Sequence, residues 1–259
     1  YMQTSGDLRW GIAAVNLRGS ESTAFAQHTS NGYLLKTVTP EGDSMLRRVR
    51  SHRAFADWTL DPAGAESLFA RESVHMVTIT VTESGYYTDP AGDLNRDDPA
   101  IAAELAAGAL GASRTTVYAY LAAGLSARKD ANGTALTICC CDNIRHNGTM
   151  LKRNLLKYLE LLGDVSLVEW VTAHVRFPCS MVDRITPRAT QDLADSLRAE
   201  TGETVTHPVM AEAFTQWVLE DNFAGPMPDL KQAGVTVTAD VNPYEETKIR
   251  VLNGGHTCL

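Results

Sequence analysis

Three side chains near the end of the chain could together carry acid–base chemistry. They are a lysine, an asparagine and a histidine, at Lys248, Asn253 and His256. A lysine amine serves as a general base when its pKa is lowered from about 10.4 by burial or by a nearby cation. An amide NH2 can stabilise a developing oxyanion, and an imidazole can orient a hydroxyl group. The set is therefore suited to taking a proton from an alcohol.

The spacing of these residues supports part of that chemistry. Asn253 and His256 are three residues apart and share one face of a helix. Lys248 lies roughly 140° from Asn253 around an ideal helix, so the lysine stem or a distortion near 254–255 must bring them together. Lys248 and His256 are about 12 Å apart along the axis, which leaves room for a short chain of hydroxylated carbons. The residue types alone also allow a surface lysine and a helix-end histidine.

The helix that must carry these residues has a clear start signal. Asn242 can cap it, Pro243 fits the first helical position, and Glu245 can close a capping box. We therefore expect a helix from residue 242 onward.

Two strands upstream end in polar residues. Residues 74–82 are rich in β-branched side chains and include Thr80 and Thr82, and residues 135–141 form an apolar run followed by Asn143. Open α/β sheets bind ligands beyond the carboxyl ends of their strands. The asparagine amide could there reach a nicotinamide or a substrate oxygen. The threonines could instead be ordinary edge or core residues.

The order of strands and helices predicts the fold class. Strands and helices alternate over residues 8–185, which is typical of a doubly wound, Rossmann-like α/β domain. The short strands that follow suggest an appended sheet, at residues 205–209, 214–219 and 235–239.

Further residues are candidates for cofactor binding. In dinucleotide folds, an acid just past the second strand binds the adenosine ribose and repels a 2′-phosphate, and Glu21 follows the predicted strand 8–18. Arg18 could instead accept that phosphate. Asp183, at the end of another predicted strand, is a further candidate, although it could simply pair with Arg184.

Composition excludes several classes of partner. The 259 residues carry a net charge of −8 and no basic block, which disfavours nucleic acid. The sequence has no run of about 18 apolar residues, so no membrane span is expected, and the first residues do not resemble a signal peptide. The cysteines, at 139–141, 179 and 258, suit buried thiols and lack zinc-ligand spacing. We expect a cytoplasmic protein without a metal; the oligomeric state is not predicted.

Five motifs follow one another along the chain: VTESGY (81–86), CDNIRHNG (141–148), MVDRITP (181–187), QWVLED (216–221) and YEETKIRVLNGGH (244–256). Together they resemble the motifs of the long-chain polyol dehydrogenases, the mannitol dehydrogenase and fructuronate reductase family. The resemblance implies zinc-independent, NAD-dependent hydride transfer between a secondary alcohol and a ketose. It also implies a role for each matching residue.

In those roles, Lys248 is the general base, and Asn143 and Asn253 hold the oxyanion. His256 positions a neighbouring hydroxyl, Glu245 relays protons to solvent, and Glu21 selects NAD over NADP.

The substrate is less closely specified. Residues 33–42 and 85–87 resemble the members that oxidise D-arabinitol to D-xylulose. Interconversion of D-mannitol and D-fructose is an alternative, and so is reduction of a hexuronate (fructuronate or tagaturonate), whose carboxylate would call for an added cation. A catalytically inactive sugar- or nucleotide-binding module is disfavoured by the intact Lys248 set. A zinc-dependent dehydrogenase is disfavoured by the missing ligand pattern.

The sequence departs from the family in three ways. The family's first strand and glycine-rich phosphate turn do not precede Tyr1, and its helical substrate domain extends beyond the position of Leu259. We therefore expect residues 1–239 to be an NAD-binding domain without its first strand, and 240–259 to begin a helical substrate domain. Cys179 replaces an expected asparagine.

The expected lack of the phosphate turn and of most of the substrate domain should limit activity. The 259-residue chain alone should bind NAD poorly and form little NADH from D-arabinitol, because the pyrophosphate loop and most of the substrate lid are absent. Absorbance of NADH measures this directly. Robust turnover by this chain would contradict the prediction.

Overall fold

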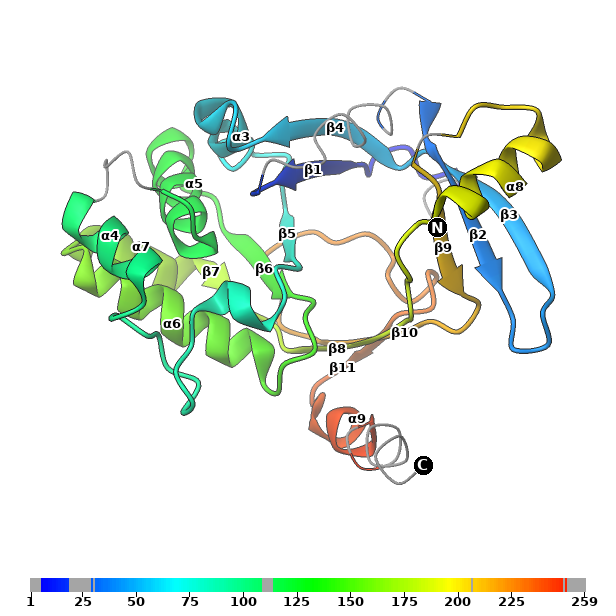
Figure 1. Ribbon diagram of the computed structural model, residues 1–259. Coiled ribbons are helices and arrows are strands. Elements are labelled where there is room, and N and C mark those ends of the chain that lie inside the picture. The colour runs from blue at the N-terminus through cyan, green and yellow to red at the C-terminus, as the bar shows by residue number, and fades with distance from the viewer. Residues whose placement is uncertain are drawn as a thin grey trace. The chain divides into compact units, whose positions relative to one another are not determined.

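The computed structural model describes residues 6–18, 29, 31–108, 114–205, 207–248 and 250. The chain divides into two compact units. Unit 1 comprises Tyr1–Ala65 and Asp183–Gln216, and unit 2 comprises Glu66–Val182 and Trp217–Leu259. Figure 1 labels the helices and strands of both units.

The described residues of unit 1 form two small sheets. Strand β1 pairs in parallel with β4, and β2 lies between β3 and β9. The elements are β1 (Ile12–Asn16), β2 (Tyr33–Val38), β3 (Ser44–Val49), β4 (His52–Asp57), α8 (Gln191–Thr201) and β9 (Val209–Glu212). Helix α3 (Pro62–Ser67) follows β4 and continues into unit 2.

Strands β2 and β3 form a hairpin. They run antiparallel, with Thr37 opposite Met45. The turn is closed by the Thr39 N–H, which donates to the Asp43 carbonyl at 2.8 Å. Gly42 sits in this turn with φ of 92°, a conformation that glycine adopts without steric cost.

Unit 2 contains the parallel sheet β5-β6-β7 and a second sheet in the order β11-β10-β8. Helices gather beside β6 and β7 (Figure 1). The elements are β5 (Met76–Ile79), the 3-10 helix η1 (Glu83–Tyr86), α4 (Pro99–Ala107), α5 (Val117–Ala131), β6 (Leu136–Cys140), α6 (Asn147–Leu161), α7 (Val165–His174), β7 (Val175–Arg176), β8 (Ser180–Asp183), β10 (Gln216–Glu220), β11 (Thr236–Thr238) and α9 (Asn242–Thr247).

Strand β6 is the centre of the parallel sheet, and all five of its residues are buried. A central parallel strand is covered on both faces, which explains why its sequence is apolar apart from Thr137, whose hydroxyl accepts from the Ala224 N–H. Helix α6 packs on β6, and its fully buried leucines follow the helical period, at 151, 155 and 159. The predicted α/β fold class is confirmed.

The cysteines of β6 lie in the core. A hydrogen bond with Cys141 and burial raise the pKa of the Cys139 thiol well above its usual range, and burial raises that of Cys140 to about 12. Both therefore remain protonated thiols near neutral pH. No helix in the described ranges is long and apolar enough to cross a membrane.

Some elements differ from those predicted. Strands β4 and β7 were not expected, because β4 mixes charged and small residues and β7 has only two residues. The strand expected at residues 205–209 lies instead at Val209–Glu212, where it pairs with β2. Tertiary pairing here outweighs local propensity.

One buried carboxylate joins α4 to the start of α5. Glu104 is 2 % exposed, and its Oε1 accepts from the backbone N–H groups of Thr115 and Thr116. Its Oε2 accepts from the Thr116 hydroxyl at 2.7 Å and from the Tyr158 hydroxyl at 3.0 Å. Such a carboxylate is stabilising because every donor that faces it is satisfied.

Replacing that carboxylate should destabilise unit 2. Glu104→Gln should lower the free energy of unfolding by about 1–3 kcal/mol, because the amide NH2 would face donors in a buried site. Urea denaturation measures the change. Glu160→Gln is the matched control, since the Glu160 side chain is 54% exposed and pairs with the exposed Lys157, and it should change stability by less than about 0.5 kcal/mol. Equal effects of the two variants would show that burial of Glu104 adds nothing.

Candidate active site

A buried asparagine ties the end of β6 to the start of β8. The Asn147 amide NH2 donates to the carbonyls of Asp142 at 3.1 Å and Ser180 at 2.9 Å, and its oxygen accepts from the Ser180 N–H at 2.9 Å. The Ser180 hydroxyl donates to the Cys140 carbonyl at 2.6 Å. These bonds fix the polar segment that follows β6 against the neighbouring strand.

The turn into α6 is equally constrained. His146 adopts a left-handed conformation, with φ of 50° and ψ of 39°. A Cβ atom on Gly148 would meet the carbonyl oxygens of Phe177 and Pro178 at 2.5 Å. The chain before β8 therefore packs directly on the first turn of α6, and only glycine fits there.

Helix α9 starts as expected but is capped differently. The expectation that Asn242 is the N-cap is wrong, because Val241 holds that position and its side chain makes no capping hydrogen bond. Val241 is buried with Met181 and Val218, and this contact sets where the chain turns into the helix. The capping-box role of Glu245 is also wrong, since its carboxylate contacts His146 instead. Pro243 does lie in the first turn.

Lys248 lies just after α9 and is only 9 % exposed. Its Nζ donates to the Val182 carbonyl at 2.6 Å and to the Asn143 side-chain oxygen at 3.3 Å. The structure thus joins two of the predicted site residues, from segments 105 positions apart in sequence. Lys248 is not a surface lysine.

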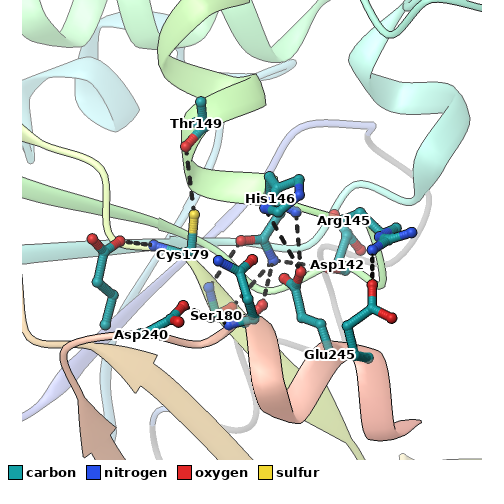
Figure 2. Close-up of polar contacts among 12 residues, drawn as sticks. Asp142, Arg145, His146, Thr149, Cys179, Ser180, Asp240 and Glu245 are labelled. Carbon is teal, nitrogen blue, oxygen red and sulfur yellow. Dashed lines mark hydrogen bonds and ion pairs between the residues drawn. The ribbon is translucent and has the colours of Figure 1, made fainter. Parts of the chain in front are cut away.

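Glu245 lies near Lys248 on α9 and is 6 % exposed. Its Oε2 accepts from the His146 backbone N–H at 3.4 Å and lies 3.9 Å from the His146 Nδ1 (Figure 2). Its Oε1 is buried without a hydrogen-bond partner in the described part of the chain. On the outer side of the helix, Glu246 pairs with both Arg145 and Arg250.

The loop after β5 reaches the same place. Thr80 and Thr82 are both exposed beyond the end of β5. Asp142 accepts hydrogen bonds from the backbone N–H groups of Val81 at 2.8 Å and Thr82 at 3.3 Å. The carboxyl ends of β5 and β6 are therefore held side by side.

A cavity of about 220 Å³ opens at this edge of the sheet. Its lining combines cationic and anionic side chains with the amide of Asn143. The charged members are Glu83, Asp142, Arg145, Glu245 and Lys248. A polar ligand of a few carbon atoms fits such a lining better than an apolar one.

The remaining predicted residues belong to unit 1 or lie outside the described residues. Arg18 follows β1 in unit 1, where its N–H bonds to the Asn16 side chain at 3.2 Å. Asp183 ends β8 and also belongs to unit 1. Glu21, Asn253 and His256 lie outside the described residues. Across the described ranges, no cluster of three or more histidine, cysteine or acidic side chains could hold a metal ion.

Sequence reasoning missed Asp142, Asn147 and Ser180 as residues that build the site. All three lie in or beside the motifs that carried the family resemblance. Their roles depend on contacts between strands, which spacing along the chain does not reveal.

Comparison with known proteins identifies the family. The profile described as "Mannitol dehydrogenase Rossmann domain" matches residues 7–232. The chain belongs to the mannitol dehydrogenase family. The motif resemblance is thereby confirmed at the level of the family.

Individual relatives agree with this placement. The chain is 40% identical over 253 residues to D-arabinitol 4-dehydrogenase of Ralstonia nicotianae, covering 97% of this chain and 53% of that protein. It is 36% identical to the polyol:NADP oxidoreductase of Gluconobacter oxydans, covering 96% and 52% of the two chains. A solved structure of Pseudomonas fluorescens mannitol 2-dehydrogenase, a ternary complex with NAD and D-mannitol, superposes with a TM-score of 0.89 at 34% identity. That match covers 98% of this chain and 52% of the other. The chain thus spans about half the length of these relatives.

The contact at Gly148 generates a prediction. Gly148→Ala should lower the free energy of unfolding by about 1–3 kcal/mol, because backbone atoms of residues 177–178 must move to admit the methyl group. Thermal or urea denaturation measures the change. Gly225→Ala is the matched control, since open space surrounds that glycine. A Gly148 variant as stable as this control would show that the segment before β8 moves aside freely.

Proposed function

We propose that the protein of this chain oxidises a sugar alcohol to a ketose, with NAD as the hydride acceptor and Lys248 as the general base. The observation that carries the proposal is the buried lysine amine, hydrogen-bonded to Asn143 at the wall of a polar cavity. Membership of the mannitol dehydrogenase family supports it. D-arabinitol, oxidised to D-xylulose, is the substrate that we favour, because an arabinitol dehydrogenase is among the similar relatives.

The residues of unit 2 fit a dinucleotide at the carboxyl edge of the parallel sheet. Exposed hydroxyls of Thr80 and Thr82 follow β5, and the exposed Asn143 follows β6. This edge is where open α/β sheets bind nucleotides. When bound there, NAD supplies the nicotinamide ring that accepts hydride from the carbinol carbon. We keep Arg18, Glu21 and Asp183 as further cofactor-binding candidates, with Glu21 favouring NAD over NADP.

Lys248 would take the hydroxyl proton of the substrate on its Nζ. Asn143 holds that amine by its side-chain oxygen, which leaves its NH2 group to donate to the alcohol oxygen as charge develops. Asn253 and His256 would complete the oxyanion site and orient a neighbouring hydroxyl, as the family resemblance implies.

The proton must then leave the enclosed amine. Glu245 lies on the same helical segment and is buried, whereas the His146 side chain beside it is 55% exposed. Glu245 would carry the proton from the cavity toward this exposed side. The Oε1 of Glu245, which has no hydrogen-bond partner among the described residues, is available to accept it.

The charges of the cavity favour a neutral polyol over a hexuronate. Arg145 could bind a substrate carboxylate, but it forms an ion pair with Glu246. A neutral chain of hydroxyl groups needs no unpaired cation.

We also place the boundary between the NAD-binding domain and a helical substrate domain near residue 240.

A substrate panel tests the proposal on the full-length protein. D-arabinitol with NAD should give the highest kcat/KM. With NAD as cofactor, D-mannitol and D-sorbitol should give lower values, and D-arabinitol should give a lower value with NADP than with NAD. Fructuronate and tagaturonate with NADH cover the reductase alternative. Higher kcat/KM with a hexuronate would replace the polyol assignment, and no turnover with any pair would overturn the dehydrogenase assignment.

The base is tested in the same assay. Lys248→Met should reduce kcat by about 10²–10⁴-fold, because a positioned proton acceptor contributes that much. Lys157→Met is the control, since that lysine is more than half exposed and pairs with the exposed Glu160. A Lys248 variant that keeps normal kcat would remove the lysine from the mechanism.

A further inference from the structure

One carboxylate connects the loops that follow β5 and β6. Oδ2 of Asp142 accepts from the Val81 N–H at 2.8 Å and from the Tyr86 hydroxyl at 2.7 Å. Oδ1 accepts from the Thr82 N–H at 3.3 Å. All three donors belong to the segment after β5, whereas Asp142 itself stands just after β6.

The segment that Asp142 holds is strained. Thr82 has φ of 64° and ψ of 164°, a conformation that side chains branched at Cβ rarely adopt. Such a residue costs about 1–3 kcal/mol and persists only where its surroundings impose it. The Asp142 carboxylate can impose this conformation, because it accepts hydrogen bonds from the consecutive backbone N–H groups of Val81 and Thr82. Asp142 therefore sets the direction in which the Thr82 side chain leaves the sheet.

Tyr86 fixes the carboxylate from the core side. Its side chain is fully buried, with the hydroxyl 3.0 Å from the Cys140 sulfur. The Tyr118 hydroxyl donates to the Tyr86 carbonyl at 2.9 Å. Burial raises the pKa of Tyr86 far above its usual value, so the phenol stays protonated and keeps donating.

The backbone of Asp142 is held as firmly as its side chain. Its carbonyl accepts from the Asn147 amide at 3.1 Å and from the Ile144 N–H at 2.8 Å. The next residue is Asn143, which accepts from Lys248. A rotation of Asp142 would therefore move the amide that holds the catalytic amine.

We propose that Asp142 is a positioning residue that couples the strained Thr82 loop, on the cofactor side of the site, to the Asn143–Lys248 pair on the substrate side. Tyr86 is the buried donor that keeps its carboxylate in register. The inference rests on the proposed dehydrogenase function and assigns Asp142 no proton transfer. It acts through Thr82 and Asn143.

Asp142→Asn in the full-length protein tests the coupling. The amide has nearly the same shape, but its NH2 group would face donors that the carboxylate accepts. We expect KM for NAD to rise about tenfold and kcat for the preferred polyol to fall about tenfold, because small misplacements at an active site have effects of this size. A residue that only stabilises the fold would lower the unfolding midpoint and leave both constants of the folded enzyme unchanged.

A second variant keeps the test decisive if Asp142→Asn fails to fold. Tyr86→Phe removes one donor and leaves both backbone bonds to Asp142, so the same two constants should change in the same direction by about two- to fivefold. The double variant should show less than the summed effect, because the two residues act as one unit. Asp97→Asn is the control, since that carboxylate is 90% exposed.

The outcomes separate the two claims. Wild-type constants in both the Asp142 and the Tyr86 variants would overturn the coupling and leave the dehydrogenase assignment standing. A full-length wild-type protein without turnover on any polyol would overturn the proposed function first. Fully additive effects in the double variant would show that Tyr86 acts independently of Asp142.

Discussion

The site depends on keeping a lysine amine out of water while giving it hydrogen-bond acceptors. A buried amine that lacks acceptors costs several kcal/mol, so its surroundings must supply them at fixed places. Here they are a backbone carbonyl of β8 and the side-chain oxygen of Asn143. Both stand at one edge of the sheets in unit 2. The position of Lys248 therefore depends on how firmly the ends of β6 and β8 are joined.

That joint is made of polar groups buried where the two strands end. Asn147 and Ser180 exchange hydrogen bonds with each other and with the backbone of β6 and the segment after it. Farther from this edge, β6 and α6 are packed mainly by apolar side chains, among which Thr137 and Asn154 are buried polar residues. Apolar packing fixes the layers of the fold, but it is tolerant of small shifts. Hydrogen bonds are directional, and they are needed here because the Lys248 amine must lie at a fixed distance from its acceptors.

Periodicity and composition were sufficient to predict the main layers. Residues 74–82 contain the strand expected from their β-branched side chains, and residues 135–141 contain the strand expected from their apolar run. Strand β4 could not be found this way, since it depends on pairing with β1 and not on its own residues. The start of α9 was misjudged for a similar reason, because the burial of Val241 outweighs the capping tendency of Asn242.

The candidate site was predicted unevenly. The types of Lys248 and Asn143 suggested chemistry, and the motif resemblance assigned their roles, but ideal helix geometry did not join the lysine to its partners. The sequence did not reveal the roles of Asp142, Asn147 and Ser180. The hydrogen bonds that define these roles join residues 33 or more positions apart, and the partner in each bond is a backbone group. A polar residue beside a motif gives no sign of whether it faces solvent or closes a joint.

The Ser180 amide has a consequence for how this edge of the sheet opens. Its hydrogen is bonded to the Asn147 side chain, not to a neighbouring strand. Deuterium from the solvent can replace that hydrogen only when the side-chain bond breaks. The hydrogen-exchange rate of this amide therefore reports local opening where β6 and β8 are joined, separately from unfolding of the sheet. The measurement needs no substrate.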